Sequence, residues 1–132
     1  MQLILDNSEK KEYFYNALCN GLSSLQHDFD IELSFEDADY LEARDYFEYF
    51  TGNSPCFEDV LMSILFDRNK TLTFIDHNEF NNNVHFITKD TVLERVNNTP
   101  MKHLIDMFNG HDDATTATVI LQQVIFNEQI YA

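Results

Sequence analysis

The segment from Asp28 to Asp59 constrains the fold more than any other part of this sequence. Its 32 residues contain eleven carboxylates and a single cation, Arg44, so the segment holds a net charge of −10 out of −15 for the whole chain. Aromatic side chains recur through the same segment from Phe29 to Phe50. A disordered acidic tail is poor in aromatic residues. We therefore expect the carboxylates to be held on a folded scaffold.

The size and composition of the chain predict one globular domain spanning residues 1–132. At 132 residues, with 44% of them hydrophobic, the chain is long enough to bury roughly two-thirds of its unfolded surface in a single core. It has no apolar run of about 18 residues and no secretory signal at its start, which favours an intracellular, cytoplasmic protein. Abundant Asn, Phe and Tyr with little Gly and Pro are typical of AT-rich coding and suggest a bacterial or phage source.

Hydrophobic periodicity and capping residues predict an α+β fold with about six helices and a small, mainly antiparallel sheet. The predicted helices are 9–24 capped by Ser8, 35–50, one opened by Ser54 and Pro55, 88–96, 99–109, and one from Asp112 or Asp113 to about Glu128. The predicted strands are 28–35, a hairpin over 71–87, and a short edge strand at 2–5. In the 35–50 helix, the expected buried stripe is Tyr40, Ala43, Phe47 and Phe50.

The carboxylates of the acidic segment follow first the two-residue period of a strand and then a three-residue spacing along a helix. In the 28–35 strand, alternation places Asp28, Asp30 and Glu32 on one face, about 6.7 Å apart. That spacing is similar to the phosphate spacing along one nucleic-acid strand. In the following helix, carboxylates recur at every third residue: Asp39, Glu42, Asp45 and Glu48.

Such a surface predicts a positively charged protein partner. Direct binding to nucleic acid or to an anionic membrane is excluded by the net charge, because Lys and Arg carry phosphate contacts and this chain has eight of them, scattered. The leading hypothesis is a non-enzymatic binding protein, such as an inhibitor or DNA mimic of a nucleic-acid-handling machine. The alternative is a solvated surface that only keeps the chain soluble.

The last predicted helix is apolar on two sides. One stripe follows Ala117 and Leu121, and a second stripe, displaced around the helix, contains Val119, Phe126 and Ile130. A helix that is apolar on two sides is covered on two sides. It is therefore either the central helix of the domain or the contact through which an assembly subunit self-associates.

Metal and cofactor sites find little support. The run Asp28–Glu32 alternates oxygen ligands, but Leu33 stands where a calcium loop of the EF-hand type needs Gly. His77, Glu79 and His85 flank the tip of the predicted hairpin without a recognised metal-ligand spacing. We therefore expect no metal and no cofactor.

A small hydrolase is the third hypothesis. Cys56 is predicted at the second position of a helix, where the helix N-terminus lowers a thiol pKa. No base lies near it in the sequence. With Cys19 far away and no CxxC, neither a disulfide framework nor a thiolate zinc site is indicated. A buried structural cysteine and a non-enzymatic protein are the expected outcome.

Overall fold

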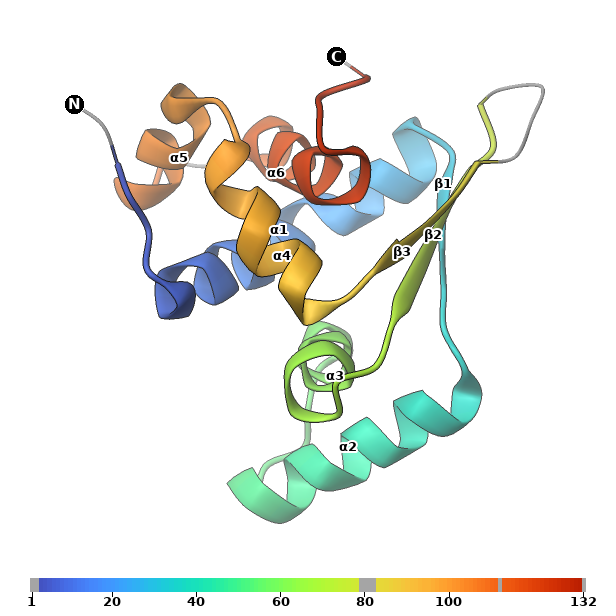
Figure 1. Ribbon diagram of the computed structural model, residues 1–132. Coiled ribbons are helices and arrows are strands. Elements are labelled where there is room, and N and C mark those ends of the chain that lie inside the picture. The colour runs from blue at the N-terminus through green and yellow to red at the C-terminus, as the bar shows by residue number, and fades with distance from the viewer. Residues whose placement is uncertain (1–2, 79–82, 112, 132) are drawn as a thin grey trace.

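The computed structural model describes residues 3–78, 83–111 and 113–131. Within these residues, six α-helices and a three-stranded antiparallel sheet form one fold (Figure 1), which confirms the predicted α+β class. None of the described helices combines the length and apolarity needed to span a membrane.

Two long helices form the centre of the fold. Helix α1 (Asn7–Asp28) begins at Asp6, whose carboxylate accepts a hydrogen bond from the Glu9 N–H at 2.8 Å, while the Glu9 carboxylate accepts one from the Asp6 N–H at 3.1 Å. Helix α6 (Ala114–Phe126) begins at Asp113, as predicted, with a 2.9 Å bond from the Thr116 N–H to the Asp113 carboxylate. The two helices pack along much of their length (Figure 1).

Helix α6 is enclosed by the domain. Every residue from Thr116 to Ile125 is buried, including the polar Gln122. Helices α1, α4 and α5 and strand β3 all pack against it. Of the two interpretations of its double apolar character, the structure shows the central helix.

The sheet consists of β1 (Ile31–Ser34), β2 (Leu72–Asp76) and β3 (Asn83–Ile87) in the order β1-β2-β3. Both pairs are antiparallel. The predicted hairpin over 71–87 is therefore confirmed, and the tip of its loop, 79–82, lies outside the described residues.

The two faces of the sheet have different surroundings. Helices α1 and α6 lie on one face, where Phe74 and Ile87 are fully buried. No helix is drawn over the opposite face in Figure 1, and there Val84 is 47% and Phe86 68% exposed. Among the described residues, helices thus cover one side of the sheet and leave the other side open.

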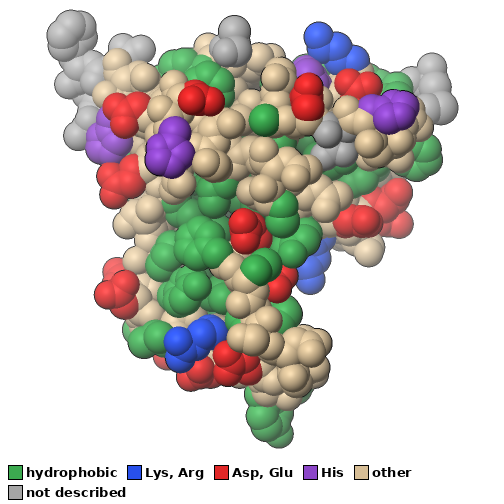
Figure 2. Space-filling model, turned by 180° about the vertical axis from the view of Figure 1, so that it is seen from behind, with side chains coloured by type: hydrophobic (Ala, Val, Ile, Leu, Met, Phe, Trp, Pro, Cys, Tyr) green, Lys and Arg blue, Asp and Glu red, His purple; other side chains and the backbone are tan. Residues whose placement is uncertain are grey.

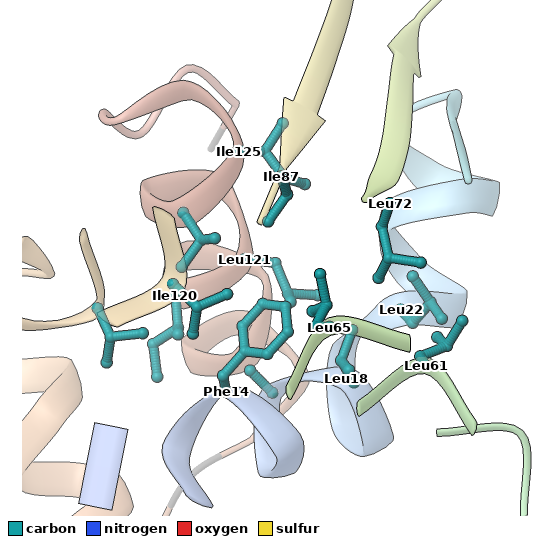
Figure 3. Packing of buried hydrophobic residues seen from close by; sticks show 14 of the residues in the cluster. Phe14, Leu18, Leu22, Leu61, Leu65, Leu72, Ile87, Ile120, Leu121 and Ile125 are labelled. Atoms are coloured by element: carbon teal, nitrogen blue, oxygen red, sulfur yellow. The ribbon is translucent and has the colours of Figure 1, made fainter. Parts of the chain in front are cut away.

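The core is one continuous cluster (Figure 3). Phe14 and Leu18 from α1, Leu121 from α6 and Leu61 from helix α3 (Phe57–Met62) all belong to it. Helix α3 continues directly into a π-helical turn, η1 (Ser63–Asp67), which adds Ile64 and Leu65. The strands close the cluster with Leu72, Phe74 and Ile87.

Helix α2 (Asp37–Thr51) lies outside this core. It packs mainly against α3 and η1, and it runs along the lower edge of the molecule in Figure 1. Ala43 is its only buried residue, and the Ala43 carbonyl accepts a 3.3 Å hydrogen bond from the Ser63 hydroxyl. Gly52, with φ of 71°, ends the helix in the left-handed conformation that Gly adopts without strain.

The remaining helices follow the sequence prediction. Helix α4 (Lys89–Arg95) is capped by Thr88 and is followed by a 3-10 turn, η2 (Val96–Asn98). Helix α5 (Met101–Phe108) begins after Pro100. These helices cover the side of α6 that the sheet leaves free (Figure 1).

Several local predictions were wrong. The helix that was expected to be opened by Ser54 and Pro55 begins at Phe57, with Cys56 as its N-cap. The expected strand over 28–35 is only Ile31–Ser34, because α1 continues to Asp28 and Asp30 turns the chain with φ of 52°. The α1 cap is Asp6 and not Ser8. Residues 3–5 of the expected edge strand form no strand.

One buried histidine makes stability depend on pH. Burial lowers the pKa of His103, whose Nδ1 lies 3.1 Å from the Thr116 hydroxyl, and Lys102 lowers that pKa further against the opposing effect of Asp106 and Asp113. An unfolded His takes up its proton near pH 6.5, while the folded state keeps His103 neutral to lower pH. Since the unfolded state then binds more protons, the His103 contribution to stability is complete above about pH 6.5 and declines as pH falls towards the folded pKa.

We expect the stability of the native protein relative to His103→Gln to fall between pH 7.5 and pH 5.5. Urea unfolding of both proteins at the two pH values measures this, and the comparison removes the effect of carboxylates common to both. A stability difference that is the same at both pH values would contradict the assignment.

Candidate acidic interface

Helix α2 carries the best-defined group of predicted site residues. Glu42, Asp45 and Glu48 are exposed, and Asp39 is half-buried. Successive steps of three residues turn back by roughly 60° around a helix, so the four carboxylates wind around α2 and do not share one line. Three of the four therefore face solvent around the uncovered side of the helix.

The other predicted carboxylates lie elsewhere. Asp28 is the last residue of α1, Asp30 lies in the turn that follows, and only Glu32 stands on the strand. The alternating row of three carboxylates on one strand face was therefore wrong. Strand β1 separates Asp28 and Asp30 from α2 along the chain and in space (Figure 1).

Little of this charge is neutralised within the described residues. The Arg44 guanidinium lies 3.3 Å from the Asp45 carboxylate, and that of Arg68 lies 3.5 Å from the Glu42 carboxylate. Both pairs are solvent-exposed, and such pairs contribute about 0–1 kcal/mol. They leave most of the negative charge of α2 available to a partner.

Exposed aromatic side chains accompany the carboxylates. Phe50, which was expected in the buried stripe, is 65% exposed, and Tyr49 is 82% exposed. The ring of Phe50 contacts Tyr46 at 4.4 Å and Tyr49 at 4.9 Å between centroids. Hydrophobic periodicity did not predict this cluster, because periodicity identifies the apolar side of a helix but not how far along the helix a neighbouring element covers it.

The first half of α2 has its own apolar hollow. It measures about 290 Å³ and is lined by Phe35, Asp37, Tyr40, Leu41 and Phe57. The rings of Phe35 and Tyr40 stack at 5.2 Å, and Leu41 remains 47% exposed. In Figure 2, hydrophobic and acidic side chains lie side by side over the lower part of the molecule, which α2 and α3 form.

Cys56 lies at the start of α3, beside Tyr15. It is an exposed residue at the N-cap of α3, not a buried one and not at the second helical position, and its N–H donates to the Asp59 carboxylate at 3.1 Å. Its sulfur lies 3.7 Å from the Tyr15 hydroxyl, and the hydrogen bond with Cys56, burial and Asp59 all raise the pKa of Tyr15. Burial also raises the pKa of the Cys19 thiol, against a hydrogen bond from Tyr15. The Cys56 sulfur thus lies against a phenol that holds its proton tightly, while the Asp59 carboxylate is engaged by the Cys56 backbone N–H.

The histidines that were considered as metal ligands are dispersed. The His77 Nε2 lies 2.9 Å from the Glu32 carboxylate, whereas His85 packs edge-on against Phe126 at 4.7 Å. In the described part of the chain, no three His, Cys, Asp or Glu side chains gather into a potential metal site. Glu79 lies outside the described residues.

The residues considered for self-association are mostly covered. Val119 is 2% exposed inside the domain, and Phe126 contacts His85 and Tyr131. Ile130 lies beyond the end of α6 and is 47% exposed. These three residues therefore form no exposed apolar face.

Six residues of the peripheral helix α2 combine charge with large apolar side chains. We call them the α2 interface: Leu41, Glu42, Asp45, Glu48, Tyr49 and Phe50. Exposed aromatic groups beside carboxylates suit binding of a cationic group, since both attract positive charge. No protein-family model, curated protein or solved structure matched the chain.

Proposed function

We propose that this chain is a non-enzymatic, cytoplasmic binding protein whose α2 interface engages a positively charged surface of another protein. The observation that supports this most is the position of α2: in its 15 residues only Ala43 is buried, while carboxylates and aromatic rings face solvent. A helix used only for packing would bury a wider stripe.

The composition of the surface fits a protein partner. Interfaces are enriched in Tyr and Phe at their centre and polar at their rim. Tyr49, Phe50 and Leu41 provide exposed apolar area, and Glu42, Asp45 and Glu48 add exposed negative charge on the same helix. Such charge also accelerates encounter with a basic partner.

The proposal does not depend on DNA mimicry. DNA mimicry was suggested by a regular row of carboxylates on a strand that the following helix continues, and β1 carries only Glu32 of the three strand carboxylates. A basic partner remains the expectation, whether or not it handles nucleic acid.

Reversing the charge of α2 should abolish partner binding. The variant Glu42→Lys/Asp45→Lys/Glu48→Lys changes three exposed side chains and raises the net charge from −15 to −9. Native and variant proteins are immobilised, exposed to a lysate of the native host, and eluted with a salt gradient. Proteins held by the native chain should elute between about 50 and 500 mM salt, where the Debye length falls from about 14 Å to about 4 Å.

The matched control is Glu12→Lys/Glu94→Lys/Glu128→Lys, which makes the same change in net charge at exposed sites outside α2. It should retain the same proteins as the native chain. If the α2 variant also retains them, or if salt does not release them, the proposed function is wrong.

A further inference from the structure

The second half of α2 forms a hollow beside η1. It measures about 440 Å³ and is lined by Glu42, Asp45, Tyr46, Tyr49, Phe50 and Arg68. We refer to these six residues as the Tyr49 hollow. Three of the six carry aromatic rings, two carry carboxylates and one carries a guanidinium. This combination favours a cationic ligand, because aromatic rings and carboxylates both attract positive charge.

The chain's own Arg68 shows how such a cation is held. Its guanidinium carbon lies 5.8 Å from the centre of the Tyr46 ring, and one of its nitrogens lies 3.5 Å from the Glu42 carboxylate. One guanidinium therefore contacts a ring face and a carboxylate of the hollow at the same time. Distances within about 6 Å of a ring centre are typical of cation–π contacts.

The rest of the hollow offers a second position of the same kind. Tyr49 and Phe50 are 82% and 65% exposed, so their rings are accessible to a ligand. The two rings contact each other edge to face, with 4.9 Å between their centroids. Asp45 also lines the hollow, and its pair with Arg44 at 3.3 Å is exposed to solvent and easily exchanged.

We propose that the Tyr49 hollow binds an arginine side chain of the basic partner, with its guanidinium against Tyr49 and Phe50 and paired with Asp45. This inference rests on the proposed function and specifies which basic group the α2 interface selects. Arginine is favoured over lysine because its planar, weakly hydrated guanidinium stacks on aromatic rings and pairs with a carboxylate through two N–H groups. A lysine ammonium is compact and strongly hydrated, so it gains less from the rings.

Two labelled peptides of equal charge test the inference: capped hexa-arginine and capped hexa-lysine, titrated by fluorescence anisotropy at about 50 mM salt. The native protein should bind hexa-arginine about three- to fivefold more tightly than hexa-lysine, as expected for an exposed cation–π contact. Tyr49→Ala/Phe50→Ala should remove this preference and leave the salt-dependent binding of both peptides. Tyr49→Phe keeps the ring and should keep the preference.

The control is Phe86→Ala/Phe108→Ala, which removes two rings that are 68% and 56% exposed on other elements. It should leave the arginine preference unchanged. Equal binding of the two peptides by the native protein, or a preference that survives Tyr49→Ala/Phe50→Ala, would overturn the arginine site while leaving the acidic interface intact. If the Glu42→Lys/Asp45→Lys/Glu48→Lys protein binds both peptides as well as the native protein does, the proposed function fails and the arginine site fails with it.

Discussion

Replacement of Gly21 by alanine is expected to lower the free energy of unfolding by about 2 kcal/mol, although alanine normally stabilises a helix by about 1 kcal/mol relative to glycine. A Cβ at residue 21 would lie 2.8 Å from the Cβ of Ala117 and 3.0 Å from two backbone atoms, the Ala117 carbonyl carbon and the Thr118 nitrogen. Backbone atoms of α6 cannot rotate away, so α1 and α6 must separate. Urea unfolding followed by circular dichroism measures the loss.

A double-mutant cycle shows whether the contact with Ala117 causes this loss. Ala117→Gly removes one of the colliding atoms, so Gly21→Ala should cost less in that background, with partial rescue because the backbone contacts remain. Ser23→Ala, at an exposed position of the same helix, is the control and should change stability by less than about 0.5 kcal/mol. A Gly21→Ala protein as stable as the native one would show that the two helices do not cross as closely as described.

Replacement of Tyr131 by phenylalanine is expected to cost about 1.5–3 kcal/mol, the range for a hydrogen bond to a charged group. The Tyr131 hydroxyl donates to the carboxylate of Asp76 at 2.6 Å, and Asp76 is only 3% exposed. Phenylalanine keeps the ring, which stacks on Phe29 at 5.7 Å. The backbone at Tyr131 also remains bound to α6 through Gln122, whose side-chain oxygen accepts a hydrogen bond from the Tyr131 N–H at 2.7 Å. The loss therefore reports on the hydroxyl.

The pH dependence identifies the carboxylate as the partner. Burial opposes the ionisation of Asp76, but hydrogen bonds from Tyr131 and Asn78 outweigh burial and hold the pKa of the carboxyl below its usual value. A lowered native pKa contributes stability that is complete above about pH 3.9, the unfolded pKa of Asp, and is lost as pH falls through the native pKa. Because Tyr131→Phe removes part of this lowering, its stability deficit should be full at pH 7 and shrink below about pH 4.

Urea unfolding of both proteins at pH 7 and pH 3 tests this, and Asp76→Asn is the control background. In that background the substitution of Tyr131 should cost less, because the charged acceptor is gone. A deficit that is equal at both pH values would mean that the hydroxyl acts through another contact.

Local capping explains the parts of the fold that the sequence predicted well. Thr88 and Asp113 begin helices where they were expected, because the hydrogen bond that defines a cap joins residues three apart. The end of α2 was also predicted closely, since the helix expected to end at residue 50 ends at Thr51. By contrast, the alternation over 28–35 resembled a strand, yet α1 extends to Asp28. A local sequence pattern does not show that an extra turn of a helix is stabilised by packing against distant residues.

For the same reason, the sequence predicted the candidate site only in part. The sequence identified Glu42, Asp45 and Glu48 as exposed carboxylates of one helix, and the structure places them there. It did not predict that Phe50 is exposed or that Arg68 lies against Tyr46. Both depend on where α3 and η1 stop covering α2.

The sequence alone determined the types and approximate limits of most elements and the concentration of negative charge in one segment, because periodicity, capping and charge depend on residues within a turn or two of each other. The tertiary structure decided which of those charges share a surface. It separated Asp28 and Asp30 from α2 and brought Arg68 to Glu42 and Tyr131 to Asp76 across 26 and 55 residues of chain. Exposure is a property of what packs against a residue, and the segments that pack together here are distant in sequence.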